Sequence, residues 1–269
     1  MASKRRLTRD RLAKPVHAPR GIMARYRQEL DALINAHREQ IITAARAAYR
    51  NAPPAADSAD SPTPYERMRE RLRSLTARAQ EEFDRRAEVI ATRYIRRTFR
   101  WSEQRLKRNL LDAGMPQVRY SDTEAWRDAL AASIGENVAL IKSMPQQLHE
   151  KVEGMVGRAF ARGSDWGALY EGLRHAFKVT HSRAKLISGD QIAKATGNVV
   201  RLRQMELGIK RARWMHSGGG KQPRPDHVAA NGKIFDVERG CKISGEYILP
   251  GQLINCRCTS RAVLPTEDD

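Results

Sequence analysis

The sequence predicts an α+β protein, with a predominantly helical body over about residues 21–207 followed by a small antiparallel β module over residues 208–265. Two observations support this class. Apolar residues recur at three- and four-residue spacing through the first part of the chain, which is typical of amphipathic helices. After Gly208 the pattern changes to short alternating runs between glycine-containing turns, which is typical of strands.

The region over residues 21–113 is expected to be helical and rich in arginine, with one interruption. Leu30, Ile34 and Ile41 belong to an apolar stripe that ends near Arg50. A linker rich in Pro and Ser follows at residues 51–64. A second helix is expected to begin at a capping box, in which Thr63 and Glu66 flank Pro64, and to run to Asp112, because Gly114 and Pro116 are stop signals.

The region over residues 114–207 is expected to hold several shorter helices. Ser121 and Glu124 have capping-box spacing, and the helix that they open is expected to end near the turn Ser143-Met144-Pro145. Residues 146–161, 165–178 and 182–207 are each amphipathic, and Gly208 offers a C-terminal cap to the last of them.

The β module is expected to contain strands at residues 210–215, 247–249 and 258–264. Asn231-Gly232 is the strongest two-residue hairpin signal in the chain, because both residues tolerate the positive φ of a type I′ turn. No internal repeat is apparent.

The charge is the outlying property of the composition, at +18 over 269 residues with an isoelectric point near 10.4. Such a charge attracts polyanions. Residues 1–113 carry 26 Lys and Arg against 14 Asp and Glu, so about two thirds of the excess lies there. Residues 1–20 begin with a basic run and are expected to form a mobile arm, for which the alternative is a merely solubilising terminus.

Several classes of protein do not fit this composition. No apolar run approaches the roughly 18 residues of a membrane span, and the amino-terminal residues lack the apolar segment of a signal peptide. The three cysteines all lie beyond residue 240, too few and too clustered for a secreted disulfide framework. We therefore expect a protein made in a cytoplasm and without membrane contact.

Two sets of cations are candidates for binding double-stranded DNA without sequence preference. One set lies on one face of a helix, beside a face that carries Tyr94, Thr98 and Trp101; the alternative for this set is a solvated face next to a core-facing aromatic stripe. The other set lies in the amino-terminal arm. The candidates are Lys4, Arg5, Arg6, Arg9 and Arg11 in the arm and Arg93, Arg96, Arg97 and Arg100 on the helix.

The C-terminal module contains the ligands of a conceivable structural zinc site, His227, Cys241, Cys256 and Cys258. No other cofactor is expected. The C-x-C spacing of the last two cysteines departs from the C-x₂₋₄-C of common zinc knuckles. Buried free cysteines beside a hydrogen-bonded histidine, or a disulfide, remain as alternatives.

An acid–base site for phosphodiester chemistry is a further alternative, using Asp226 and His227 with Arg224 and Arg257. On a strand, however, adjacent side chains point to opposite faces, so Asp226 could not orient His227 there. The phosphate-binding, dinucleotide-binding, H-E-x-x-H and G-x-S-x-G motifs are also absent. We therefore expect no enzymatic activity, with a nuclease- or toxin-like enzyme and a zinc-stabilised nucleic-acid-binding protein as the alternatives.

The order of motifs in the second half of the chain resembles the C-terminal domain of phage Mu F-like minor head proteins, also called phage head morphogenesis proteins. The combination of a histidine box, an Asn-Gly turn and an Asn-Cys-Arg-Cys end makes the resemblance specific. Asp190-Gln191 departs from the Thr-Glu that many family members carry. The residues that match the family's motif positions are Asp190, Gln191, Trp214, Arg224, His227, Asn231, Gly232, Asn255, Cys256, Arg257 and Cys258.

The resemblance implies a minor capsid protein of a tailed phage, which acts in head assembly and needs no catalytic activity. Its expected partners are the portal protein, coat or scaffold proteins and packaged double-stranded DNA, with a possible oligomer at the portal vertex. The expected location is the inside of the virion head, after synthesis in the cytoplasm of the host bacterium. Related C-terminal domains also occur fused to toxins, which keeps the enzyme alternative open.

Overall fold

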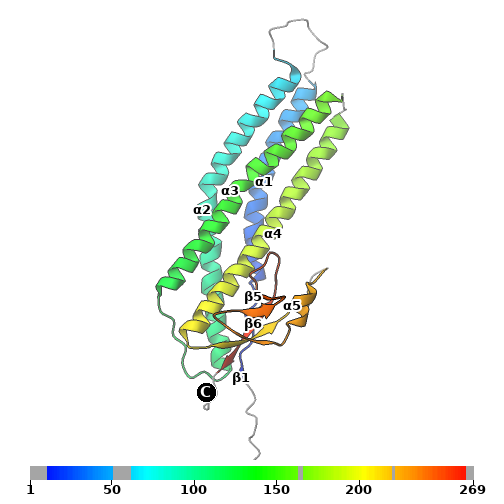
Figure 1. Ribbon diagram of the computed structural model, residues 1–269. Helices are drawn as coiled ribbons and strands as arrows, with labels where there is room; N and C mark the ends of the chain where they lie inside the picture. Colours follow the sequence, from blue (N-terminus) through cyan, green and yellow to red (C-terminus); the bar gives the residue numbers. More distant parts are fainter. Residues whose placement is uncertain (1–10, 51–61, 163–165, 220–221, 265–269) are drawn as a thin grey trace, which may run out of the picture. The chain divides into compact units, whose positions relative to one another are not determined.

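The computed structural model describes residues 11–50, 62–162, 166–219 and 222–264, and it contains four long helices followed by small antiparallel sheets (Figure 1). The α+β class with a helical body is confirmed. The long helices are α1 (Arg20–Arg50), α2 (Pro64–Asp112), α3 (Glu124–Ala161) and α4 (Trp166–Glu206). Within the described residues, no helix is long and apolar enough to cross a membrane.

The chain divides into two compact units that do not follow the expected domain boundaries. The first unit combines the segment up to Met23 with Arg93–Ser133 and the chain from Gly189 onward. The second unit consists of Ala24–Thr92 and Ile134–Ser188. Because α2, α3 and α4 each contribute to both units, no single cut in the sequence separates them.

The helix boundaries follow local signals at some ends and tertiary packing at others. The capping box at the start of α2 is confirmed: the Thr63 N–H donates to Glu66 Oε2 at 2.7 Å, and the Glu66 N–H donates to Thr63 Oγ1 at 3.2 Å. The capping box expected at Ser121 and Glu124 is wrong. Instead Thr123 caps α3, because its Oγ1 accepts the Trp126 N–H at 3.2 Å.

Two predicted helix breaks are also wrong. Pro145 lies inside α3, flanked by the buried side chains of Met144 and Leu148. Packing of this apolar stripe outweighs the hydrogen bond that a proline removes from the helix. Likewise α4 continues without interruption from Trp166 to Glu206, with Phe177 and Ala184 both buried. The C-terminal cap was placed correctly, because Gly208 has a φ of 72° just beyond α4.

The strands form one four-stranded and one two-stranded sheet. The larger sheet has the order β1 (Arg11–Leu12), β6 (Thr259–Leu264), β2 (Arg211–Met215) and β3 (Ile234–Asp236), with every pair antiparallel. The smaller sheet pairs β4 (Cys241–Ile243) with β5 (Glu246–Ile248). The three strands expected from the sequence are therefore present as β2, β5 and β6.

Asn231-Gly232 does not form the expected two-residue hairpin. These residues make a turn after the short helix α5 (Pro225–Ala229) and deliver the chain to β3. Gly232 adopts a φ of 86°, and its N–H donates to the Trp214 carbonyl at 2.8 Å. The turn chemistry was identified correctly, but the turn joins a helix to a strand.

The expected basic arm over residues 1–20 is wrong for its second half. Arg11 and Leu12 form β1, which pairs with Leu264 and Val263 of β6. Ala13 and Val16 are buried in an apolar cluster with side chains of α2, α4 and β6. The apolar residues among the cations thus have a partner that lies about 250 positions away, which local composition cannot reveal. Lys4, Arg5, Arg6 and Arg9 lie outside the described residues.

Candidate functional site

His227 is held at the centre of the C-terminal module by the short helix α5. Pro225 begins this helix, where its fixed φ suits the first turn. The carboxylate of Asp226 accepts the backbone N–H of His227 at 2.8 Å and contacts Ser244 Oγ at 3.1 Å. Both carboxylate oxygens are thus engaged away from the imidazole. Asp226 and His227 lie on a helix rather than on a strand, and the geometry does not provide the Asp–imidazole contact of an acid–base pair.

Cys256 and Cys258 face the imidazole of His227 from the segment that precedes β6. Nδ1 of His227 lies 3.5 Å from Cys256 Sγ and 3.7 Å from Cys258 Sγ. The three side chains are 2%, 3% and 6% exposed, respectively. One intervening residue places both cysteines on the same side of an extended segment. The C-x-C spacing therefore directs two sulfur atoms to one nitrogen.

Cys241 does not join this group, although the sequence suggested it as a fourth ligand. Within the described residues, the cluster that could hold a metal consists of His227, Cys256 and Cys258, whose ligand atoms lie within 4.8 Å of one another. Cys241 is buried in β4 and belongs to the apolar cluster of the module. Burial raises the pKa of its thiol, which favours the neutral form. The candidate set of four is thus corrected to a set of three.

The environment of the two clustered cysteines favours a negative charge on one sulfur. The neighbouring Cys258 thiol, together with the nearby backbone amides of Cys258 and Gly251, lowers the pKa of the Cys256 thiol against the effect of burial. The pKa of Cys258 is raised because Cys256 holds the charge and because burial disfavours a second thiolate. A buried pair of thiols next to a histidine is therefore poised to hold one thiolate.

Trp214 forms one wall of the cluster. Its side chain is fully buried, and its ring meets that of His227 edge to face at a centroid distance of 5.3 Å. Phe235 packs on it at 6.1 Å. Asn231 fixes the neighbouring segment, because its side-chain oxygen accepts the His216 N–H at 2.9 Å. Trp214 thus packs directly on His227, and Asn231 holds the segment that follows β2.

The segment that carries the cysteines is anchored to α4. Asp190 is 8% exposed, accepts the backbone N–H of Asn255 at 2.6 Å and forms an ion pair with Lys194 at 3.3 Å. Asn255 itself adopts a φ of 59°, a conformation that asparagine tolerates better than most residues. This contact joins positions 65 residues apart. Local sequence patterns do not reveal a contact between residues this far apart.

The remaining motif residues lie outside the histidine–cysteine cluster. Arg224 is exposed and donates to the Ile254 carbonyl at 3.0 Å, which fixes the loop before the cysteines. Arg257 is exposed, and Gln191 is buried. The structure therefore joins the motif residues through two centres, the histidine–cysteine cluster and the Asp190–Asn255 contact. It does not bring the arginines into the cluster.

A second candidate surface lies on α2. Arg93, Arg96, Arg97 and Arg100 are all exposed, whereas Tyr94 and Thr98 are buried. Helical periodicity places Lys107 and Arg108, also exposed, on the same side as these arginines. We call these six residues the α2 basic face. Lys107 and Arg108 were not among the residues predicted from the sequence, because Gln104 interrupts the run of cations on this face. The aromatic side chains near this face point into the core, which removes base stacking by Tyr94 from consideration.

The described residues thus offer two candidate sites, the basic face of α2 and the histidine–cysteine cluster of the C-terminal module. Residues 150–261 match the family described as Phage Mu protein F like protein. The resemblance inferred from the sequence motifs is thereby confirmed over these residues.

The chain also resembles a curated protein over about half of its length. The chain is 32% identical over 132 residues to an uncharacterised protein of Haemophilus influenzae (strain ATCC 51907 / DSM 11121 / KW20 / Rd). The aligned segment covers 49% of this chain and only 29% of that protein. The chain therefore spans less than a third of the length of this relative. No solved structure matches the chain significantly.

Proposed function

We propose that this protein is a minor structural protein of a tailed-phage head, which acts in head assembly near the portal and contacts packaged DNA through the α2 basic face. The family match over residues 150–261 supports the role in the phage head. The proposed DNA contact rests on the six exposed cations of the α2 basic face. Portal, coat or scaffold proteins are the partners that this role requires.

The α2 basic face has the charge and the dimensions for a phosphate backbone. From Arg93 to Arg108 the helix advances about 22 Å, enough to follow several phosphates of one DNA strand. Glu103 is the one acidic residue in this stretch, and it is engaged by Arg203 at 2.7 Å. Within the described part of the chain, Arg96, Arg97 and Arg100 form no ion pair. Their charges remain available to an external polyanion.

In the amino-terminal half of α2, by contrast, several arginines form ion pairs with glutamates. Glu82 engages Arg85 and Arg86, and Arg69 engages Glu153 at 2.9 Å. Such pairs leave little net charge for an external partner. The excess of positive charge on α2 is therefore concentrated at residues 93–108.

The DNA contact is tested by replacing three arginines of the α2 basic face. We expect Arg96→Gln/Arg97→Gln/Arg100→Gln to weaken binding to duplex DNA of any sequence. The slope of log affinity against log salt should become shallower by about 2 to 3 in the full-length chain, because each lost phosphate contact removes about 0.9. The control Arg71→Gln/Arg73→Gln/Arg78→Gln removes the same charge from the other half of α2. Equal effects of the two variants, or no binding of the wild-type chain to DNA, would contradict the proposal.

The role in assembly is tested separately. The wild-type chain should associate with proheads that contain the portal and should not associate with proheads lacking it. A nuclease or toxin-like enzyme instead predicts an activity that His227→Ala abolishes while the fold, followed by circular dichroism, is retained. Such an activity would replace the structural assignment.

A further inference from the structure

We propose that His227, Cys256 and Cys258 form a zinc site, with Nδ1 of the histidine and Sγ of each cysteine as ligands and a water molecule in the fourth position. The ion would tie α5 to the segment that precedes β6. This proposal rests on the geometry of the cluster and does not depend on the function proposed above.

The distances within the cluster match those of a tetrahedral site. With zinc–sulfur bonds near 2.3 Å and zinc–nitrogen bonds near 2.0 Å, the ligand atoms of a tetrahedron lie roughly 3.6 Å apart. The observed separations from Nδ1 are 3.5 Å to Cys256 Sγ and 3.7 Å to Cys258 Sγ. Nδ1 is thus nearly equidistant from both sulfurs. The alternative, a hydrogen bond from Nδ1 to one sulfur, would require only one of these two distances to be short.

The surroundings supply what metal-bound thiolates require. Backbone amides of Gly251 and Cys258 lie close enough to Cys256 to favour its thiolate, and the amide of Ser217 acts in the same way on Cys258. Such donors stabilise negative charge on sulfur and orient the ligands. All three ligands are more than nine-tenths buried, which protects the thiolates from solvent. Nε2 of His227 has no hydrogen-bond partner among the described residues, so the nitrogen with polar neighbours is the one that faces the sulfurs.

Zinc is the ion that this set of ligands favours. Two thiolates and one imidazole form a soft, nitrogen- and sulfur-only set, which excludes magnesium and calcium. Zinc adopts tetrahedral geometry with such ligands without a redox reaction. The ligands lie 29 and 31 residues apart in the sequence, on both sides of β3, β4 and β5. One ion would therefore close a loop around most of a module that has a small core.

The first experiment measures metal content and ligand type in the full-length chain. Protein purified under reducing conditions, stripped with a chelator and reloaded with zinc alone should hold one zinc per chain. Cobalt in place of zinc should give the visible absorption of a tetrahedral ion and a thiolate-to-cobalt charge-transfer band. A zinc content near zero in the reduced chain, or a six-coordinate cobalt spectrum, would overturn the proposal.

The second experiment assigns the ligands with a control from the same module. Cys256→Ser and Cys258→Ser should each lower zinc affinity at least tenfold, whereas Cys241→Ser should retain one zinc per chain, because Cys241 lies outside the cluster. Equal loss in Cys241→Ser would overturn the assignment. If a ligand variant fails to fold, alkylation of the wild-type chain decides instead. Zinc should protect Cys256 and Cys258 from a thiol reagent, and the chelator should expose them. A disulfide between Cys256 and Cys258 in the purified chain, or no difference in alkylation, would overturn the site.

Discussion

His37 is a buried histidine of α1 in the second unit. It is 4% exposed, and neither ring nitrogen has a partner among the described residues. Burial and the proximity of His149 lower its pKa from 6.5 to about 4. The folded state therefore holds His37 in the neutral form at neutral pH.

The stability of the protein should fall in acid because of this residue. Between pH 6.5 and about 4 the unfolded chain binds a proton at His37 that the folded chain does not bind. The free energy of unfolding should therefore decrease as the pH falls through this window, by up to about 1.4 kcal/mol per pH unit, and His37 should have no effect above it. His37→Leu should flatten the dependence when urea denaturation is measured at several pH values. The exposed His175→Leu is the control, and an unchanged slope in His37→Leu would show that other groups cause it.

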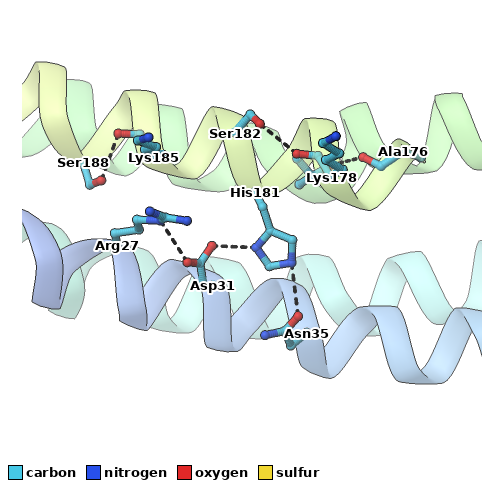
Figure 2. A network of polar contacts seen from close by, with 10 residues as sticks. Arg27, Asp31, Asn35, Ala176, Lys178, His181, Ser182, Lys185 and Ser188 are labelled. Carbon is cyan, nitrogen blue, oxygen red and sulfur yellow. Dashed lines mark hydrogen bonds and ion pairs between the residues drawn. The ribbon is translucent and has the colours of Figure 1, made fainter. Parts of the chain in front are cut away.

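His181 shows the opposite arrangement in the same unit. Figure 2 shows its ring between two side chains of α1, with Nδ1 2.6 Å from Asp31 Oδ1 and Nε2 3.1 Å from Asn35 Oδ1. Arg27 holds the other carboxylate oxygen of Asp31 at 3.2 Å. This histidine joins α4 to α1 through polar contacts, whereas His37 contributes only volume to the core.

Gly197 shows how closely α4 approaches the loop before the cysteine segment. A Cβ atom at this position would lie 2.8 Å from the Pro250 carbonyl oxygen, which is closer than real Cβ contacts allow. Gly251 in the same loop has a φ of 83° and lies near the carbonyl of Ala193. The backbone contact between α4 and this loop therefore depends on the absence of a side chain.

Substitution of two glycines of α4 by alanine should have opposite effects. Gly197→Ala should lower the free energy of unfolding by about 1 to 3 kcal/mol, because helix and loop must separate to admit the methyl group. Gly189→Ala, with no atom within 4 Å of the added Cβ, should be neutral or stabilising by up to about 1 kcal/mol. Thermal and urea denaturation of both variants provides the measurement. Equal stability of the two would refute the close approach.

The sequence predicted those elements whose causes are local. The start of α2 at Thr63 and the cap at Gly208 depend on neighbouring residues, and both are present. The helix through Pro145 and the strand at Arg11 were missed because distant packing and pairing partners decide them. The candidate site shows the same division. The motif identified His227, the C-x-C pair and Asp190, but only the fold could exclude Cys241 from the cluster and show that Asp190 binds the backbone of Asn255.

The two ends of the described chain meet in one sheet. The backbone of Ala13 donates to the Ala262 carbonyl at 3.0 Å, and Arg261 donates to the carbonyls of Ala13 at 2.9 Å and Leu12 at 3.3 Å. Arg261 thus satisfies two backbone acceptors next to β1. This arrangement makes a side chain of β6 responsible for holding a strand that lies 249 residues earlier.

Loss of the Arg261 side chain should release β1 more than it perturbs the rest of the sheet. Arg261→Ala should lower the free energy of unfolding by about 1 to 2 kcal/mol, because buried carbonyls lose their donors. Hydrogen exchange of the backbone amides at Leu12 and Ala13 should accelerate more than exchange in β2. Arg257→Ala, at an exposed position near the same strand, is the control. Unchanged exchange at Ala13 would show that Arg261 does not hold β1.

The pairing of β1 with β6 also imposes an order on folding during synthesis. The ribosome makes Arg11 and Leu12 before the four long helices, and their partners Val263 and Leu264 emerge only after those helices. The four-stranded sheet can therefore be completed only after β6 has been made, and until then the apolar residues Ala13 and Val16 lack part of their burial. A nascent chain that stalls before β6 would expose this segment, which makes it a natural site for chaperone binding or proteolysis.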